Sequence, residues 1–175
     1  IICQEVPKRK LDNSTTERHQ GVIAYVAPYS YFELDEVVNN LEINKDTTLL
    51  ILDHIEDPHN LGAIIRTAEA SGVKAIIIPK RRAAVVSQTA VKASAGAIEH
   101  MPVIRVSNLT DAIKKLKEKG FWIAGTTLAE RSEDYTKIAK DVPLAIVIGN
   151  EGEGMSKVVT NECDFLYHLP MLGKI

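Results

Sequence analysis

Short apolar runs alternate with amphipathic stretches along most of the chain. Runs of aliphatic residues predict strands, and apolar residues that recur every three or four positions predict helices. The expected strands are residues 22–27, 49–52, 75–78, 103–106, 121–125 and 144–148. The expected helices are residues 33–41, 60–71, 87–95, 109–119 and 155–163. This alternation predicts an α/β fold, with a mainly parallel sheet flanked by helices on both faces. Phe121 and Trp122, which begin one strand, are expected in the core.

The last of these apolar runs leads directly into a glycine-rich turn, residues 149–154 (Gly-Asn-Glu-Gly-Glu-Gly). Backbone amides in such a turn can approach a ligand closely, because three of its residues have no side chain. A phosphate loop would continue with Gly-Lys-Ser or Gly-Lys-Thr, whereas this turn contains Glu151 and Glu153. Two carboxylates repel a triphosphate and tolerate a neutral or cationic nucleoside, such as a sulfonium. The turn alone is equally consistent with a nucleoside pocket and with a tight turn that binds nothing.

A second loop with candidate chemistry follows the expected strand 49–52. Asn60 is suited to cap the helix that begins there. On that helix, Gly62 and Arg66 share a face that is separate from the apolar stripe. A glycine one turn before an arginine should allow a large substrate to approach the guanidinium. The alternative is a solvated arginine that pairs with Glu56 or Glu69.

Composition limits the function classes. The 175 residues are 45% hydrophobic and 25% charged, which is typical of one soluble globular domain. Because 21 basic residues face 23 acidic ones, the net charge of -2 gives no global attraction to nucleic acid. An RNA site must therefore be a local patch, for which Lys80, Arg81 and Arg82 are the candidates; a solvated charge run is the alternative.

Cysteine usage and hydropathy suggest a cellular location. Two cysteines make no disulfide framework, and no apolar run reaches the length of a membrane span, so a reducing cytoplasm is expected. The spacing of the histidines and cysteines fits no metal site. The chain begins without methionine and stops abruptly, which suggests a piece of a longer protein. Residues 1–6 are expected to be the remnant of a preceding domain, residues 7–20 a linker, and residues 21–175 the main domain.

Three motifs in order resemble those of a known family. They are residues 57–62 (Asp-Pro-His-Asn-Leu-Gly) with Arg66 four positions on, residues 148–155, and residues 169–173 (Leu-Pro-Met-Leu-Gly). In this order and spacing they look like the motifs of the SpoU (TrmH-type) ribose 2'-O-methyltransferases of the SPOUT superfamily. The similarity covers nearly all of residues 17–173. Arg-His-Gln-Gly at residues 18–21 is similar to the bacterial branch that methylates a guanosine ribose in 23S ribosomal RNA.

The resemblance implies features that the residue pattern does not show. It implies a deep trefoil knot near the C-terminus, S-adenosylmethionine bound in that knot, a homodimer, and large-subunit ribosomal RNA as the partner. Asn60, Arg66 and Glu151 match the catalytic residues of the family. The expected cofactor-binding residues are Ile148, Gly149, Asn150, Gly152, Leu169 and Met171. Arg66 is also expected to contact RNA, together with Lys80, Arg81 and Arg82. The family's third motif continues into a Ser-Leu-Asn-Val-Ser segment, which this sequence does not reach.

The implied reaction restricts the roles of these residues. Methyl transfer from a sulfonium to a ribose hydroxyl needs alignment, exclusion of water and a more nucleophilic oxygen, but no metal. A guanidinium is almost never deprotonated, so Arg66 is expected to orient the substrate and stabilise charge rather than act as a simple base. Glu151 has an alternative role as a cap of the helix after the turn. The alternative functions are tRNA 2'-O-methylation, antibiotic-resistance methylation of rRNA, and non-catalytic RNA binding or assembly with the same fold.

Overall fold

The fold is built around a seven-stranded, all-parallel sheet. The computed structural model describes residues 2–173 except 17, 26, 140 and 172. The strands are β1 (Thr48–Asp53), β2 (Ile76–Pro79), β3 (Val103–Val106), β4 (Trp122–Thr126), β5 (Glu133–Asp134), β6 (Leu144–Gly149) and β7 (Phe165–His168). Their order in the sheet is β3-β2-β1-β6-β4-β7-β5. The predicted α/β class with a parallel sheet is therefore confirmed.

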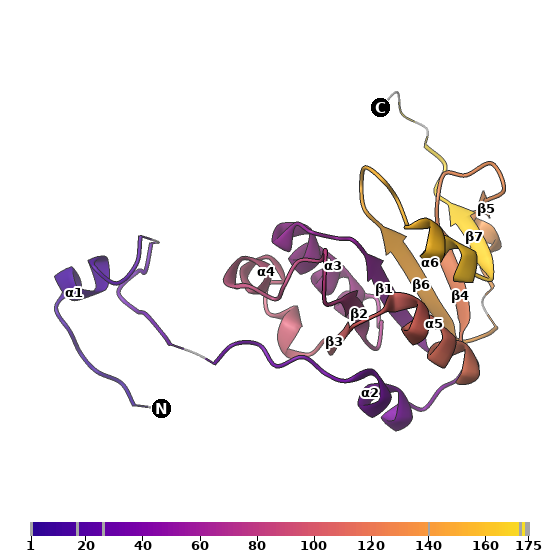
Figure 1. Ribbon diagram of the computed structural model, residues 1–175. Helices are drawn as coiled ribbons and strands as arrows, with labels where there is room; N and C mark the ends of the chain where they lie inside the picture. The colour runs from indigo at the N-terminus through magenta and orange to yellow at the C-terminus, as the bar shows by residue number, and fades with distance from the viewer. Residues whose placement is uncertain (1, 17, 26, 140, 172, 174–175) are drawn as a thin grey trace.

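Helices cover both faces of this sheet, as Figure 1 shows. The helices are α1 (Lys8–Asp12), α2 (Leu34–Asn40), α3 (Pro58–Ala70), α4 (Gln88–Ala93), α5 (Leu109–Glu118) and α6 (Lys157–Glu162), with 3-10 helices η1 (Ala97–Glu99) and η2 (Tyr135–Lys137). Helices α2, α5 and α6 pack on one face, and α3, α4 and η1 pack on the other. Because side chains alternate along a strand, Leu49 and Ile51 enter the first core while Leu50 and Leu52 enter the second.

The register of the central strands places the two informative loops side by side. Strand β1 pairs with β6 along its whole length, from Thr48 opposite Leu144 to Asp53 opposite Gly149. The two strands therefore end at the same level. Because parallel strands all end at one edge of the sheet, the loops that follow β1 and β6 start from adjacent points.

Helix α3 begins earlier than expected. Pro58 is its first residue, and the carboxylate of Asp57 accepts a hydrogen bond from the backbone N–H of His59 at 2.7 Å. Proline suits this position because its missing N–H would have no helical partner. The prediction that Asn60 caps the helix is wrong, since Asp57 does so. The Asn60 side chain is thereby free for another contact.

Other expectations fail where a strand lacks a partner or lies near an edge. The described residues of 22–27 form no strand, and Tyr25 is 89% exposed. Figure 1 shows this N-terminal segment, with helix α1, lying apart from the sheet. Strand β7 was not expected from the sequence. Trp122 is 44% exposed rather than buried; it stacks on Phe165 of the neighbouring strand β7, with ring centroids 5.3 Å apart.

Candidate active site at the carboxyl edge of the sheet

Two of the three predicted catalytic residues meet at the carboxyl edge of the sheet. The side-chain amide of Asn60, in the first turn of α3, donates a hydrogen bond to Oε1 of Glu151, 91 residues further along the chain. Glu151 lies in the turn after β6 and does not cap a helix. Helix α6 begins at Lys157, and Ser156 is its N-cap residue. The alternative role of Glu151 as a helix cap is therefore wrong.

The turn that carries Glu151 closes on itself. We call residues 149–154 the glycine loop. The backbones of Asn150 and Gly154 exchange two hydrogen bonds, of 3.0 and 2.9 Å. A Cβ atom at Gly149 would lie 2.2 Å from the carbonyl carbon of Gly154, so this close approach requires glycine. The Asn150 side-chain oxygen accepts from the amides of Gly152 and Glu153, at 2.8 and 3.2 Å. Those two amides are occupied and cannot cradle a phosphate.

The glycine loop is also tied to the end of strand β1. The side-chain amide of Asn150 donates to the backbone carbonyl of His54 at 3.1 Å. Just beyond the loop, the backbone N–H of Ser156 donates to Oδ2 of Asp53 at 2.6 Å. Asp53 is 1% exposed. Our sequence reasoning missed Asp53 and His54, although a carboxylate that ends an otherwise apolar run was the available signal.

Arg66 lies further along helix α3 and has no acidic partner among the described residues. It is exposed, and neither Glu56 nor Glu69 forms an ion pair with it in the part of the chain that the structure describes. It lies six positions after Asn60, a rise of about 9 Å along the helix axis. The structure therefore leaves the guanidinium available to an external group, and does not place it in contact with Asn60 or Glu151.

Gly62 has a different role from the expected one. It is buried, and a Cβ atom there would lie 2.5 Å from the carbonyl oxygen of Ala90 and from Cβ of Ala93. The glycine thus allows helix α4 to pack closely against α3. It does not open a path to Arg66.

The predicted RNA-contacting cations follow strand β2 at the same edge. Lys80, Arg81 and Arg82, which we call the basic segment, are all exposed. None of the three forms an ion pair within the described residues. The next turn is held by a backbone hydrogen bond of 2.7 Å from Ala84 to Ile55. The segment therefore displays three uncompensated positive charges beside the loops that follow β1.

The predicted cofactor-binding residues lie at the ends of two strands of this edge or in the segments that follow them. Ile148 and Gly149 end β6 and are half-buried. Leu169 and Met171 follow β7 and are 62% and 68% exposed. Leu128, in the loop after the intervening strand β4, is a third exposed apolar side chain, and sequence reasoning missed it. Apolar side chains are thus exposed to solvent after two neighbouring strands of this edge.

Comparison with known proteins decides the family. Residues 47–175 match the SpoU rRNA Methylase family. The chain belongs to this family. Residues 1–32 of this SpoU methylase match a second family, described as RNA 2'-O ribose methyltransferase substrate binding. The resemblance drawn from the three motifs is therefore confirmed at the level of the family.

Individual relatives agree with this assignment. A Staphylococcus saprophyticus protein assigned to the TrmH family of tRNA/rRNA methyltransferases is 53% identical over 176 residues, covering all of this chain and 70% of that protein. The AdoMet-bound rRNA methyltransferase of Sinorhizobium meliloti is 32% identical over 83% of this chain and 54% of its own, with a TM-score of 0.74. The SpoU methyltransferase AviRb of Streptomyces viridochromogenes, in complex with the cofactor AdoMet, is 26% identical over 83% and 57%, with a TM-score of 0.71. This SpoU methylase spans about half the length of these two solved chains.

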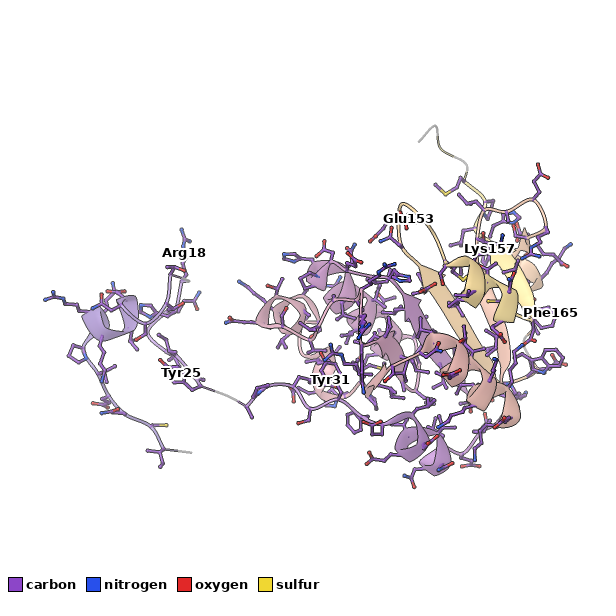
Figure 2. All side chains as sticks on the ribbon, in the orientation of Figure 1. Arg18, Tyr25, Tyr31, Glu153, Lys157 and Phe165 are labelled. Atoms are coloured by element: carbon purple, nitrogen blue, oxygen red, sulfur yellow. The ribbon has the colours of Figure 1, made fainter. Side chains whose placement is uncertain are left out.

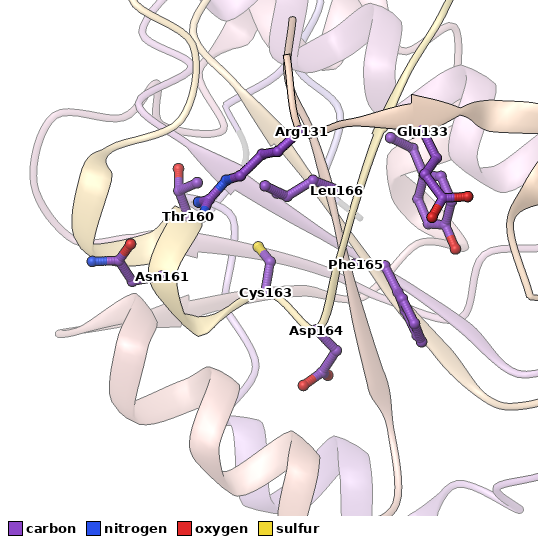
Figure 3. A pocket seen from close by; sticks show the side chains of 9 residues that line it. Arg131, Glu133, Thr160, Asn161, Cys163, Asp164, Phe165 and Leu166 are labelled. Carbon is purple, nitrogen blue, oxygen red and sulfur yellow. The ribbon is translucent and has the colours of Figure 1, made fainter. Parts of the chain in front are cut away.

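A cavity elsewhere in this SpoU methylase contains none of the predicted site residues. It measures about 440 Å³ and lies between α6, β7 and the segment before β5 (Figure 3). Its lining includes Arg131, Thr160 and Cys163. Burial raises the pKa of the Cys163 thiol to about 11, with a smaller contribution from the nearby Asp164 carboxylate. The thiol is therefore protonated at neutral pH and is not an activated nucleophile.

The described part of the chain lacks two further features. No three side chains of His, Cys, Asp or Glu lie together there as a metal ion would require. No helix there has both the length and the apolar character needed to cross a bilayer.

Proposed function

We propose that this chain supplies the catalytic domain of an enzyme that methylates a ribose 2'-hydroxyl of RNA, with S-adenosylmethionine as the methyl donor. The observation that carries the proposal is the contact between Asn60 and Glu151, which joins the first two motifs at one edge of the sheet. Arg66, which forms no ion pair within the part of the chain that the structure describes, lies on the same helix as Asn60. AdoMet bound in two solved relatives supports the donor.

The glycine loop suits a cationic nucleoside better than a phosphate. Asn150 occupies the amides of Gly152 and Glu153, which a phosphate would need. Glu151 and Glu153 place two exposed carboxylates in the loop, where they attract a positive charge; Figure 2 shows Glu153 on the loop that leaves β6. The residues that would hold the cofactor are Ile148, Gly149, Asn150, Gly152, Leu169 and Met171. When bound, S-adenosylmethionine supplies a methyl group on a sulfonium, which a ribose oxygen displaces in line without a metal.

The side chains of the site contribute positioning and charge stabilisation. The Arg66 guanidinium can hold an RNA phosphate through paired N–H groups and stabilise negative charge on the attacking oxygen. Asn60 occupies Oε1 of Glu151 and so fixes the carboxylate. Oε2 then remains to accept a hydrogen bond from the substrate. Such preorganised groups act without reorganising during the reaction.

For the substrate, we propose a guanosine of large-subunit ribosomal RNA. Arg-His-Gln-Gly at residues 18–21 supports this choice, and the substrate-binding match of residues 1–32 supports an RNA substrate in general. Transfer RNA and an antibiotic-resistance target in rRNA are the alternative substrates. The exposed basic segment supplies cations for the RNA backbone. The boundaries at residues 6 and 20, the trefoil knot, the homodimer and the cytoplasmic location remain predictions from the sequence and its family.

The decisive experiment is methyl transfer from radiolabelled S-adenosylmethionine to separate rRNA and tRNA transcripts, with the full-length protein. We expect label in 23S rRNA, on a ribose of a guanosine. Label in tRNA alone would overturn the proposed substrate and keep the reaction. Label in neither RNA would support the non-catalytic alternative.

Arg66→Ala tests the role of the arginine. We expect methyl transfer to fall by a factor on the order of 10² or more, because a preorganised donor is lost. S-adenosylmethionine affinity, measured by calorimetry, should change little, since Arg66 forms no ion pair with any described residue and is not among the predicted cofactor-binding residues. Lys114→Ala removes an exposed cation from α5 and is the matched control. Near-normal turnover by Arg66→Ala would exclude the proposed role.

A further inference from the structure

A buried carboxylate ends strand β1, next to the site but outside its motifs. Asp53 is 1% exposed and lies opposite Gly149 in the sheet. A buried carboxylate is costly unless hydrogen bonds compensate for its lost hydration. Its Oδ2 accepts the short hydrogen bond from the backbone of Ser156. Nδ1 of His54 lies 2.7 Å from Oδ1, yet Oδ1 accepts no hydrogen bond from any described residue.

The end of β1 holds the glycine loop at both of its ends. Asn150, near the start of the loop, is bound by the carbonyl of His54. Ser156, just after the loop, is bound by Asp53. His54 adopts a left-handed conformation, with φ of 62°, which turns the chain at this point. Glu151 lies between the two tethers, so its position depends on both.

We propose that Asp53 is a positioning residue, which fixes the glycine loop in the shape that binds S-adenosylmethionine and presents Glu151 to Asn60. This inference rests on the proposed function for the identity of the ligand. The carboxylate itself is buried behind the loop and does not touch the substrate. Its effect reaches the loop through the backbone N–H of Ser156, from which the carboxylate accepts one hydrogen bond.

The opposite end of the same strand carries a buried polar residue whose role is purely structural. Thr47, just before β1, is 2% exposed. Its hydroxyl donates to the carbonyl of Glu42 at 3.2 Å and accepts from the backbone of Asn44 at 3.0 Å. Both partners lie within five residues. Asp53 instead reaches a partner 103 residues away, just after the loop that carries the second motif. The contrast assigns Thr47 to the local turn and Asp53 to the site.

The first test compares cofactor affinity among variants of the full-length protein. Asp53→Ala should weaken S-adenosylmethionine binding roughly tenfold or more, since a charge-assisted hydrogen bond is lost. Asp53→Asn should recover most of this loss, because its amide oxygen can still accept from Ser156. Thr47→Val is the control: it should lower the melting temperature without changing the affinity. In turnover, the KM for S-adenosylmethionine should rise in Asp53→Ala while the KM for RNA stays constant. Equal affinity of Asp53→Ala and wild type would overturn the proposal.

The second test uses hydrogen exchange and needs neither cofactor nor RNA. The Ser156 amide should be protected in the wild type and exchange at least tenfold faster in Asp53→Ala, but not in Thr47→Val. Ser156→Pro removes the same N–H at a φ of -60° that proline tolerates. Combined with Asp53→Ala, it should weaken cofactor binding no further than the worse single variant. Unchanged exchange in Asp53→Ala would overturn the tether. A wild type that binds no S-adenosylmethionine would overturn the proposed function, while the exchange data would still decide whether Asp53 holds the loop.

Discussion

The glycine loop and the basic segment lie at the same edge of the sheet but are built in opposite ways. The glycine loop is acidic, its backbone hydrogen bonds are internal, and both of its ends are tied to β1. The basic segment has three exposed cations, and none of their side chains forms an ion pair within the described residues. The glycine loop therefore has a fixed shape, whereas the basic segment has positive charges that can bind an external group.

This difference separates two kinds of recognition at one site. A small ligand that must align with a reacting oxygen needs a preorganised wall, because small misplacements cost rate. An RNA backbone needs cations on flexible stems, which bind phosphates without a fixed geometry. Substitutions in the two loops should therefore affect different measurements.

Gly149→Ala should have the largest effect, because it breaks the fixed loop. The added Cβ would lie 2.2 Å from backbone atoms of Gly154 and Met155, which cannot move without opening the turn. We expect S-adenosylmethionine binding to become undetectable by calorimetry. The free energy of unfolding should fall by roughly 1–3 kcal/mol, as in overpacked sites.

Gly152→Ala is the matched control for folding stability. A Cβ atom there would meet only the side-chain oxygen of Asn150, at 3.5 Å, which is ordinary contact. Its melting temperature should stay close to that of the wild type. Normal cofactor binding by Gly149→Ala would contradict the fixed shape that we assign to the glycine loop.

Replacing Lys80, Arg81 and Arg82 together by Gln should have an intermediate effect, confined to RNA. Up to three phosphate contacts would be lost, so the slope of log binding constant against log salt should fall by about 2, at roughly 0.7 per contact on single-stranded RNA. Filter binding over a salt series measures this slope. Cofactor affinity should not change.

Lys45, Lys74 and Lys119 provide the control for this triple variant. All three are exposed, and they precede strands β1, β2 and β4, at the opposite edge of the sheet. Their replacement by Gln changes the net charge equally. An equal loss of RNA affinity in both triple variants would show that the basic segment has no special role.

The smallest expected effect concerns the chemical reactivity of Cys163, whose side chain lies near Met155, just after the glycine loop. Its sulfur and the methyl group of Met155 both pack against Gly125. Because the folded pKa is raised from 9.0 to about 11, the thiol contributes stability below pH 9, and this contribution is lost as the pH rises from 9 to 11. At pH 8, iodoacetamide should modify Cys163 far more slowly than the exposed Cys3, as mass spectrometry can measure. Comparable rates at the two cysteines would contradict the burial.

Central strands were predictable from the sequence because they are buried on both faces. The apolar runs of β1 and β6 have no polar interruption, and their burial matches that pattern. Strand β7 was not predictable, since its run of four residues is short, only partly buried and ends in the polar His168, next to the edge strand of the sheet. The opposite error concerns residues 22–27. Their apolar run predicted a strand, but its described residues pair with no other strand.

The sequence predicted candidate residues for the site but not the contacts between them. The motifs identified Asn60 and Glu151, yet only the register of β1 against β6 brings them together. Gly62 was assigned to substrate access because a sequence does not show that α4 packs there. Asp53 was missed because its partner is a backbone amide, and a backbone amide leaves no signature in the sequence.

The long separation between Asp53 and Ser156 has a consequence for biosynthesis. A contact that spans 103 residues closes only after the intervening chain has been made and folded, which delays it relative to local structure. Residues 1–32, which match a substrate-binding family, emerge from the ribosome long before strand β6 is synthesised. The part of the protein matched to RNA recognition is thus synthesised well ahead of the loop that carries Glu151, and the site is completed only when the central strand of the sheet has been inserted.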